Sequence, residues 1–213
     1  MIDINIIPGG SIGTNCYLLV DRDNSEALLV DYVPEAERII TAEKLSVDVL
    51  LLTHIHYDHI EGLSSFQKDH KFDLYLSEFG YDNINDPLKN LVAYTPFMDE
   101  YNNTDKVNLD RTRKIYDDDV IKWGDHSFEV VSSPGHSPDS VMYVLNEKKC
   151  VFSGDTLFKM SVGRTDFPGS DHQSMINAIN NLFTKTGDDY IVYPGHGDST
   201  TIGFEKKNNP FLT

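Results

Sequence analysis

Short apolar runs alternate with polar turns along most of the chain, and the spacing of the apolar residues predicts both strands and helices. The predicted strands cover residues 2–7, 14–20, 27–30, 47–52, 72–76, 115–121, 128–131, 141–145, 150–152 and 190–193. The second and third of these are expected to form a hairpin across residues 21–25. The predicted helices cover residues 34–45, 59–70, 171–187 and 200–207, and Asp171 is expected to cap the third of them.

The strands form two blocks, and helices lie between and after them. This order predicts two sheets packed face to face, each covered on its outer side by helices, which is a mixed α/β architecture. The length of 213 residues suits one domain over residues 1–213. Residues 78–113 are less regular, and we predict an insertion there, which either covers a substrate or packs on the surface away from it.

The charge of the chain narrows the classes of partner. Its 18 Lys and Arg residues stand against 34 Asp and Glu, and the formal net charge of −16 would repel nucleic-acid backbones and anionic membrane surfaces. The first residues lack the basic region and apolar core of a signal peptide, and no run is long enough to span a bilayer. We therefore expect a soluble, cytoplasmic protein with neither nucleic acid nor membrane as partner. Cys16 and Cys150 lie in apolar runs and are expected to be reduced, buried thiols.

The segment from Thr53 to His59 directly follows the apolar strand at 47–52 and has the sequence Thr-His-Ile-His-Tyr-Asp-His. Side chains two residues apart on an extended backbone point the same way, so His54, His56 and Asp58 would line one side of this loop. His59 would open the next helix. The alternative is a polar, solvated turn, but the whole chain has only eight histidines. We therefore predict a metal-binding segment.

Three later apolar runs also end in short turns that carry a candidate ligand. His136 follows Ser-Pro-Gly, Asp155 follows Ser-Gly, and His196 follows Pro-Gly. Sites collect where strand ends meet, because a rigid scaffold holds the loops there while their side chains stay accessible. The complete candidate set is His54, His56, Asp58, His59, His136, Asp155 and His196.

The number of these ligands indicates how many ions the site would hold, and their type limits which metals are suitable. Seven ligands are too many for one tetrahedral ion with an open position, and they suit two ions that share a carboxylate. Imidazole and carboxylate without thiolate are compatible with zinc, iron or manganese.

As a spaced set, these residues resemble the metallo-β-lactamase superfamily, whose hallmark H-x-H-x-D-H is followed by a distant His, an Asp and a final His. The resemblance implies a four-layer αββα sandwich with two divalent transition-metal ions, zinc being the first choice, at the rim between the sheets. It implies one ion held by His54, His56 and His136, a second held by Asp58, His59 and His196, and Asp155 as the bridge. A metal-bridging hydroxide would be the nucleophile. Asp58 is either a simple ligand or the catalytic group that orients this hydroxide or accepts its proton.

Within this superfamily, the chain most closely resembles the short glyoxalase II-like (hydroxyacylglutathione hydrolase-like) enzymes. The shared segments are 154–158, 163–169 and the tail Asn209-Pro210-Phe211. This resemblance implies hydrolysis of S-lactoylglutathione or a related small acyl thioester. Full-length glyoxalase II has a Lys and a Tyr where this chain has Arg164 and Asp166, so the thiol part of the substrate stays open. Arg164 is expected either to bind a substrate carboxylate or to pair internally with Asp166 or Asp171.

Other functions share the histidine motif. A persulfide dioxygenase has a similar Gly-Arg-Thr-Asp-Phe segment but resembles a mononuclear iron oxygenase, whose ligands here would be His54, His136 and Asp155. Pro168 after Phe167 favours the thioester hydrolase. A non-hydrolytic metal-binding or redox module of the flavodiiron type would replace some histidines with carboxylates and add a flavodoxin domain, and the sequence shows neither. β-Lactam hydrolysis is disfavoured, because secreted β-lactamases carry an export signal and typically lack the bridging carboxylate.

Overall fold

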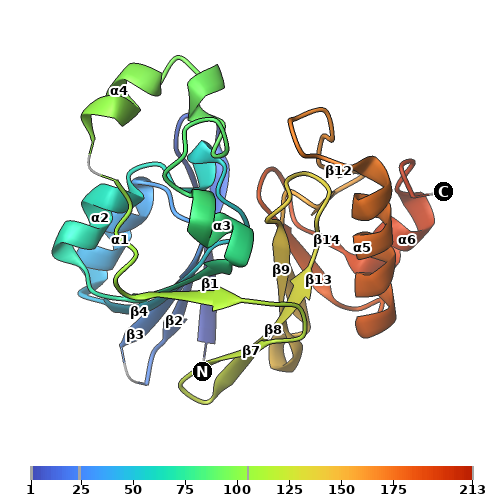
Figure 1. Cartoon of the computed structure of the whole chain (residues 1–213). Helices are drawn as coiled ribbons and strands as arrows, with labels where there is room; N and C mark the ends of the chain where they lie inside the picture. Colours follow the sequence, from blue (N-terminus) through green and yellow to red (C-terminus); the bar gives the residue numbers. More distant parts are fainter. Residues whose placement is uncertain (1, 24, 105, 213) are drawn as a thin grey trace. The chain divides into compact units, whose positions relative to one another are not determined.

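The computed structural model describes residues 2–23, 25–104 and 106–212 and contains two compact units, Met1–Lys114 and Ile115–Thr213 (Figure 1). Asn24, in the turn predicted at 21–25, and Asp105, in the predicted insertion, lie outside the described residues. Each unit is built on a six-stranded sheet with helices packed against it. The predicted mixed α/β class is therefore confirmed.

The first unit contains the elements β1 (Ile2–Gly9), β2 (Thr14–Asp21), β3 (Glu26–Val30), α1 (Glu35–Glu43), β4 (Ser46–Leu51), η1 (Tyr57–His59), α2 (Leu63–Asp69), β5 (Asp73–Ser77), α3 (Glu78–Asn83), η2 (Val92–Tyr94), α4 (Met98–Asn103) and β6, which begins in this unit (Thr112–Ile115). The strand order of its sheet is β1-β2-β3-β4-β5-β6. β1, β2 and β3 are antiparallel neighbours, whereas β3, β4 and β5 run parallel, because α1 and α2 connect them. Parallel strands end at the same edge of a sheet, so the segments after β3 and β4 start side by side.

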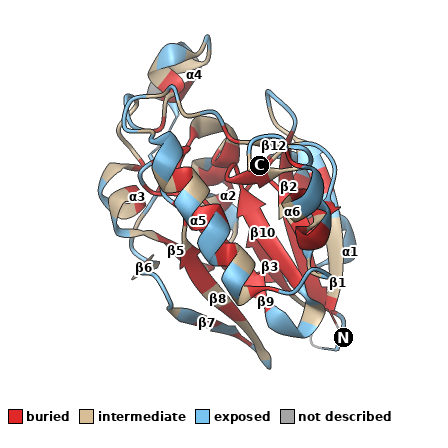
Figure 2. Cartoon of the chain, turned by 90° about the vertical axis from the view of Figure 1, so that its right-hand side faces the viewer, coloured by how far each residue is buried: buried red, intermediate tan, exposed pale blue. Residues whose placement is uncertain are grey.

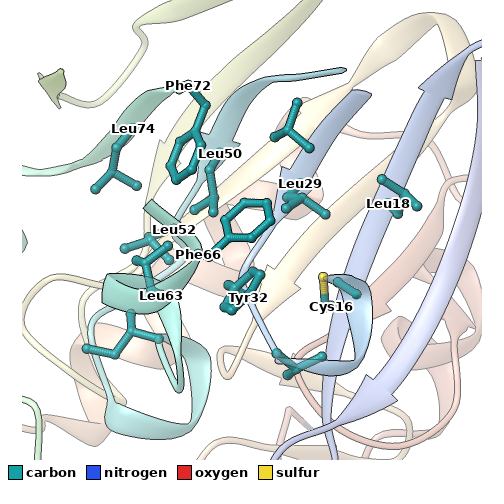
Figure 3. Packing of buried hydrophobic residues seen from close by; sticks show 14 of the residues in the cluster. Cys16, Leu18, Leu29, Tyr32, Leu50, Leu52, Leu63, Phe66, Phe72 and Leu74 are labelled. Carbon is teal, nitrogen blue, oxygen red and sulfur yellow. The ribbon is translucent and has the colours of Figure 1, made fainter. Parts of the chain in front are cut away.

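One face of this sheet packs against α1 and α2 (Figure 3). Leu18, Leu29 and Leu50 come from three neighbouring strands and share a buried cluster with Phe66 of α2. The ring of Phe66 stacks on Tyr32, with 4.6 Å between the ring centroids. Burial of each such side chain stabilises the folded state by roughly 1.5–3 kcal/mol. The strands that lead into the ligand segment are therefore held in place by a well-packed core.

The second unit contains the elements β7 (Val120–Trp123), β8 (His126–Ser132), β9 (Val141–Leu145), η3 (Asn146–Lys148), β10 (Cys150–Gly154), β11 (Leu157–Phe158), β12 (Ser161–Val162), α5 (His172–Lys185), β13 (Ile191–Pro194), β14 (Thr200–Thr201) and α6 (Ile202–Asn208). The strand order of its sheet is β14-β13-β10-β9-β8-β7, and β11 and β12 form a separate antiparallel hairpin. β10 and β13 are parallel because α5 connects them, while the other neighbours in this sheet are antiparallel.

Helix α5 has one buried and one exposed side, and β10 is buried along its whole length (Figure 2). Met175, Ile179 and Leu182 of the buried side belong to one apolar cluster of this unit. The predicted cap of α5 is confirmed, because the Asp171 side chain accepts a hydrogen bond from the Ser174 amide at 2.7 Å. The α5 packing therefore anchors the two parallel strands whose ends carry predicted ligands.

Three predicted elements differ from the structure, and the simplest case is the helix predicted at 200–207, which begins only at Ile202, after the short strand β14. The strand predicted at 115–121 is two strands, because β6 ends at Ile115 and β7 begins at Val120 in the other sheet. Between them Asp118 has a φ of +64° and the Asp119 carboxylate accepts a hydrogen bond from the Tyr116 amide, so short acidic side chains stabilise a turn. The helix predicted at 59–70 begins only at Leu63, after Gly62 at a φ of +78°. His59 lies in the preceding 3₁₀ turn, so the prediction that it opens the helix is wrong.

Residues 78–113 contain α3, η2, α4, irregular connections and the start of β6. The prediction of one domain over 1–213 with an insertion here stays a prediction. Cys16 and Cys150 are buried free thiols, as predicted. Within the part of the chain that the structure describes, no helix is both long enough and apolar enough to cross a membrane.

Candidate metal centre

A buried carboxylate at the end of β3 holds the turn that follows β4. Asp31 directly follows β3 and is 1% exposed. It accepts two hydrogen bonds from Thr53, from the amide at Oδ1 and from the hydroxyl at Oδ2, both at 2.8 Å. Asp31 has a φ of +57°, a left-handed conformation that Asp adopts more readily than most residues. The parallel pairing of β3 and β4 brings Asp31 and Thr53 together, and their contact sets the start of the ligand segment.

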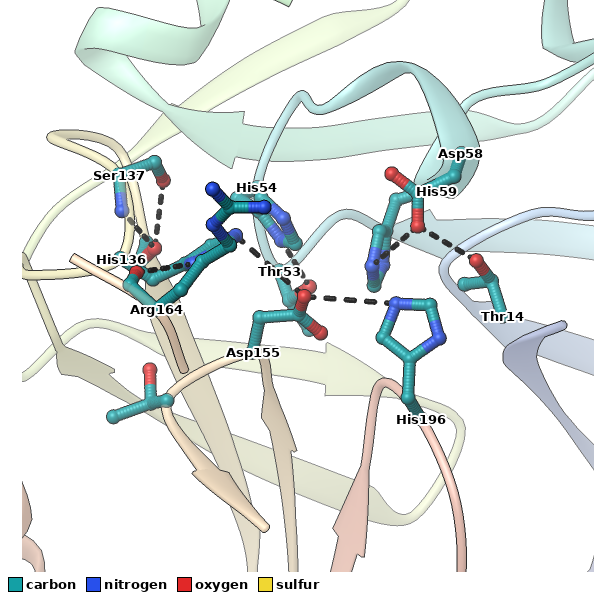
Figure 4. A network of polar contacts seen from close by, with 12 residues as sticks. Thr14, Thr53, His54, Asp58, His59, His136, Ser137, Asp155, Arg164 and His196 are labelled. Carbon is teal, nitrogen blue, oxygen red and sulfur yellow. Dashed lines mark hydrogen bonds and ion pairs between the residues drawn. The ribbon is translucent and has the colours of Figure 1, made fainter. Parts of the chain in front are cut away.

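Asp31 also orients His59. Nδ1 of His59 lies 2.8 Å from Asp31 Oδ2, and both side chains are buried. The ring donates its Nδ1 hydrogen to the carboxylate, which places the lone pair on Nε2. That Nε2 lies 3.3 Å from Asp58 Oδ2, and the same oxygen accepts a hydrogen bond from Thr14 Oγ1 at 2.7 Å (Figure 4). His59 and Asp58 therefore direct their donor atoms to one place.

Thr53 orients His54 in the same way. Its single hydroxyl hydrogen is donated to Asp31, so its oxygen accepts the hydrogen of His54 Nδ1, 3.1 Å away. The lone pair of His54 therefore lies on Nε2. The centroid of its ring is 4.5 Å from that of His56 and 4.1 Å from that of His59. The four ligands predicted in the first unit form one cluster.

In the second unit, Asp155 and His196 follow two parallel strands. Gly154, the last residue of β10, pairs with Pro194, the last residue of β13. The Gly195 amide donates a hydrogen bond to the Gly154 carbonyl at 2.8 Å, so the backbone just before one ligand is tied to the backbone just before the other. Asp155 Oδ2 lies 3.6 Å from His196 Nε2.

His136 joins this pair from the turn after β8. Its Nε2 lies 3.5 Å from Asp155 Oδ2, and its Nδ1 donates to the Arg164 carbonyl at 2.9 Å. Gly163 makes this arrangement possible, because a Cβ there would lie 1.9 Å from the Asp155 carbonyl oxygen. A side chain at 163 would have to move away from the Asp155 carbonyl, and the adjacent Arg164 carbonyl that orients His136 would move with it. The three ligands predicted in the second unit therefore also form one cluster.

The donor atoms of both clusters fit divalent metal ions. Two atoms bound to one ion at about 2.1 Å with a tetrahedral angle lie roughly 3.4 Å apart. The separations between Nε2 and Oδ2 are 3.3 Å for His59 with Asp58, and 3.5 and 3.6 Å for Asp155 with its two histidines. These separations exceed ordinary hydrogen-bond lengths. Some of these histidines donate their Nδ1 hydrogen to a protein oxygen. Metal-binding histidines usually make this hydrogen bond, which leaves Nε2 available to bind the ion.

Arg164 pairs with a neighbouring carboxylate through its side chain. Its Nε and Nη2 lie 2.5 and 2.6 Å from Oδ1 and Oδ2 of Asp166. These hydrogen bonds hold the pKa of the Asp166 carboxyl below its ordinary value. The predicted internal pair is therefore present with Asp166, whereas Asp171 caps α5. Both partners of the pair are mostly exposed, and exposed ion pairs are weak.

The sequence analysis missed Asp31 and Thr14, which orient predicted ligands. A signal for Asp31 was present, because it ends the apolar run at 27–30 just as the later ligands end their own apolar runs. Thr14 gives no comparable signal. It stands at the start of a predicted strand, and only folding brings its hydroxyl to Asp58.

Comparison with known proteins identifies the family. The model of the metallo-beta-lactamase superfamily matches residues 9–196, a span that includes all seven predicted ligands. The chain belongs to the metallo-beta-lactamase superfamily. Its histidine and aspartate groups fit the divalent ions, typically two, that this superfamily binds.

The matches to individual relatives extend over nearly the whole length of this superfamily member. Hydroxyacylglutathione hydrolase GloC from Haemophilus influenzae is 33% identical, and the match covers 99% of this chain and 98% of GloC. The crystal structure of BLEG-1 B3 metallo-beta-lactamase is 34% identical with a TM-score of 0.86, covering 99% of this chain and 100% of that one. The structure of TTHA1623 in a di-iron-bound form is 28% identical with a TM-score of 0.78, covering 98% and 100%. The predicted metallo-β-lactamase type of fold is confirmed.

Proposed function

We propose that the chain is a metal-dependent hydrolase of small acyl thioesters that uses two divalent transition-metal ions, zinc being the first choice. In this proposal the two units act as one catalytic domain. One ion would be held by His54, His56 and His136. The other would be held by Asp58, His59 and His196, and Asp155 would be shared between them.

The position of Asp155 carries the proposal. Its Oδ2 lies 3.5 Å from His136 Nε2 and 3.6 Å from His196 Nε2. One carboxylate oxygen is therefore close to two imidazoles that we assign to different ions. A carboxylate shared in this way is expected of a two-ion centre. Two such ions supply a water of lowered pKa and a polarised carbonyl, which is the chemistry that hydrolysis of an ester or thioester requires.

Asp58 is our candidate catalytic residue, in addition to its role as a ligand. The hydrogen bond from Thr14 Oγ1 and the contact with His59 hold its Oδ2 in place. A carboxylate held in this way can orient the attacking water and take its proton. Arg164 is our candidate for binding a substrate carboxylate, because its guanidinium presents a planar pair of donors and its present partner, Asp166, is exposed.

The thioester assignment is supported by the relatives. GloC is named a hydroxyacylglutathione hydrolase, and this chain matches almost all of its length. The di-iron form of TTHA1623 supports two metal positions and keeps iron among the candidate metals. The glyoxalase II-like resemblance rests partly on two segments near the proposed ligands: residues 154–158 contain Asp155, and residues 163–169 contain Arg164, whose carbonyl accepts a hydrogen bond from His136.

Metal analysis combined with a thioester assay tests this function. We expect the purified protein to hold about two transition-metal ions per chain and to hydrolyse S-lactoylglutathione. Activity should disappear after chelation and return when zinc is added. A protein that binds no transition metal would overturn the proposal, and one that holds two ions but cleaves no thioester would overturn the substrate class.

One observation favours a second candidate, β-lactam hydrolysis. BLEG-1 is titled a B3 metallo-beta-lactamase and is 34% identical to this chain over 99% of its length. A chromogenic cephalosporin offered to the same preparation tests this candidate. β-Lactam turnover without thioester turnover would select it over the thioester hydrolase.

The same preparation also tests the persulfide dioxygenase. Glutathione persulfide would be offered while dissolved oxygen is monitored. One iron per chain together with oxygen consumption would select the dioxygenase, for which we expect His54, His136 and Asp155 as ligands. Two ions and no oxygen consumption would exclude it.

A further inference from the structure

Glu205 of α6 is a fully buried carboxylate that the proposed chemistry does not use. Its Oε1 accepts a hydrogen bond from Thr200 Oγ1 at 2.6 Å. Its Oε2 accepts hydrogen bonds from the Met160 amide at 2.9 Å and from Asn209 Nδ2 at 2.8 Å. The three donors come from three separate segments, which this one side chain therefore ties together. Loss of the carboxylate would leave buried donors without hydrogen-bond partners, and this would lower the stability of the folded state.

The first of these segments is the β11–β12 hairpin. Met160 lies at its turn with a φ of +60°, a conformation that a Met side chain disfavours. Two contacts hold this turn from outside: the Met160 amide donates to Glu205, and Asn209 Nδ2 donates to the Ser161 carbonyl at 3.0 Å. The strained turn therefore depends on α6 and on the residue that follows it.

The hairpin joins two parts of the proposed metal centre. It begins just after Asp155, the proposed bridge, and it returns through Gly163 to the Arg164 carbonyl that orients His136. The Gly163 amide donates to the Thr156 carbonyl at 3.4 Å, which closes the base of the hairpin. A shift of the hairpin would therefore move two ligands at once.

The second segment closes the loop that carries His196. β13 and β14 pair on either side of this loop, with Val192 opposite Thr200. The Thr200 hydroxyl donates to Glu205, so the same carboxylate that holds the hairpin also holds the base of the His196 loop. The third segment is the tail, where Asn209 is fully buried and accepts a hydrogen bond from the Phe211 amide at 3.0 Å.

We propose that Glu205, supported by Asn209, is a positioning residue that sets the spacing of His136, Asp155 and His196. This inference rests on the proposed metal-binding function and adds a specific role for α6 and the Asn-Pro-Phe tail. Glu205 touches none of these ligands directly. It acts through the hairpin and the His196 loop, whose positions decide whether the three side chains can share ions.

The test compares substitutions at Glu205 in the full chain. In Glu205→Ala all three hydrogen bonds are lost. In Glu205→Gln the remaining carbonyl oxygen can accept from Met160 and Asn209, and the new amide can donate to the Thr200 hydroxyl. Zinc affinity would be measured by competition with a chromogenic chelator. Hydrogen exchange of the Met160 and Gly195 amides would be measured in metal-free protein.

We expect Glu205→Ala to bind zinc roughly tenfold more weakly, the lower end of the range for groups that hydrogen-bond a metal ligand, because Glu205 acts only through the hairpin and the His196 loop. Its Met160 and Gly195 amides should exchange faster than those of the wild type, even without metal. Glu205→Gln should restore both measurements to near wild-type values. Asn209→Ala, which removes only the Asn209 contacts, should weaken zinc binding to a smaller extent.

Two controls separate positioning from general stability. Ile40→Ala removes buried volume from α1, in an apolar cluster that includes no residue of the hairpin or of the His196 loop, and it should lower stability with little change in zinc affinity. Asp189→Ala removes only the exposed ion pair with Lys149 and should leave zinc affinity unchanged. A loss of affinity in Ile40→Ala equal to that in Glu205→Ala would overturn the inference.

The outcomes also distinguish this inference from the proposed function. Wild-type protein that binds no transition metal would overturn the proposed function. Wild-type protein that binds two ions, together with Glu205→Ala that binds them equally well, would overturn the role of Glu205 alone. If Glu205→Ala does not fold, Asn209→Ala decides the question, and unchanged zinc affinity and amide exchange in that variant would count against the inference.

Discussion

Asp31 Oδ2 lies 2.8 Å from His59 Nδ1, and this buried carboxylate also accepts the hydroxyl hydrogen of Thr53. Through Thr53 it fixes the tautomer of His54, so one side chain at the end of β3 orients two predicted ligands. The relationship depends on the parallel pairing of β3 and β4, which brings the ends of the two strands together.

Asp31→Asn should therefore weaken metal binding without removing any ligand. Asn keeps the size of the side chain and tolerates the left-handed backbone, but its amide group replaces one of the two acceptor oxygens. An amide nitrogen in place of Oδ1 leaves the Thr53 amide without its acceptor, and one in place of Oδ2 leaves both the Thr53 hydroxyl and His59 without theirs. We expect zinc affinity to fall by ~10–100-fold, measured by chelator competition.

Asp48→Asn is the matched control for Asp31→Asn. Asp48 lies on β4, and burial raises the pKa of its carboxyl. Neutralising it removes an unfavourably buried charge, so zinc affinity should stay at the wild-type level. An equal loss of affinity in both variants would show that net charge, and not the orientation of His59, is responsible.

Asp155→Ala should abolish both metal binding at the two-ion level and thioester hydrolysis. The substitution removes the oxygen that lies near both His136 and His196. Elemental analysis and S-lactoylglutathione turnover measure the two effects, and circular dichroism checks the fold. Asp189→Ala, which removes only an exposed partner of Lys149, serves as the control and should retain both properties. Wild-type turnover in Asp155→Ala would refute the assignment of this carboxylate.

Arg164→Ala should raise KM for thioesters that carry a carboxylate more than it lowers kcat. Because Arg164 is exposed and exposed ion pairs are weak, the expected increase in KM is only roughly two- to fivefold. The backbone carbonyl that orients His136 is kept in this variant. Steady-state kinetics with a matched thioester that lacks the carboxylate provides the comparison.

A substitution at Asp166, the partner of Arg164, should change KM in the opposite direction. Asp166→Asn removes the carboxylate that now pairs with Arg164, so KM for the anionic thioester should fall. Equal effects of Arg164→Ala on substrates with and without a carboxylate would remove the proposed role of Arg164.

The stability of the protein should fall in alkaline solution partly because of Cys150. Burial raises the pKa of the Cys150 thiol from 9.0 to about 12. The folded state thus keeps a proton that the unfolded chain loses, so this contribution is full below pH 9 and is lost as the pH rises toward 12. Between pH 8 and pH 10 the loss is about 1 kcal/mol.

Urea unfolding of the wild type and Cys150→Ala at these two pH values measures this effect. The wild type should lose more stability than Cys150→Ala, because Ala has no proton to lose. The other titrating groups are the same in both proteins and cancel in the difference. A difference in unfolding free energy that does not change with pH would contradict the prediction.

The local pattern of residues was sufficient to predict the elements that carry the ligands. The apolar runs before His54, Asp155 and His196 predict strands because side-chain alternation and β-propensity act over a few residues. The Asp171 cap of α5 was predictable for the same reason, since a cap involves only neighbours along the chain. The spacing of the ligands carried the family resemblance, which the match to residues 9–196 confirms.

Contacts between distant segments were not predictable from such local patterns. Asp31 reaches His59, Thr14 reaches Asp58, and Glu205 reaches the β11–β12 hairpin, and in each case many residues separate the partners along the chain. A buried polar group needs a partner, but its sequence neighbourhood does not specify which one, because strand order and loop path decide that. The same reason explains why residues 115–121 divide between two sheets. Local chemistry thus determines the strands and the donor types, whereas the packing of distant segments determines how the donors are oriented.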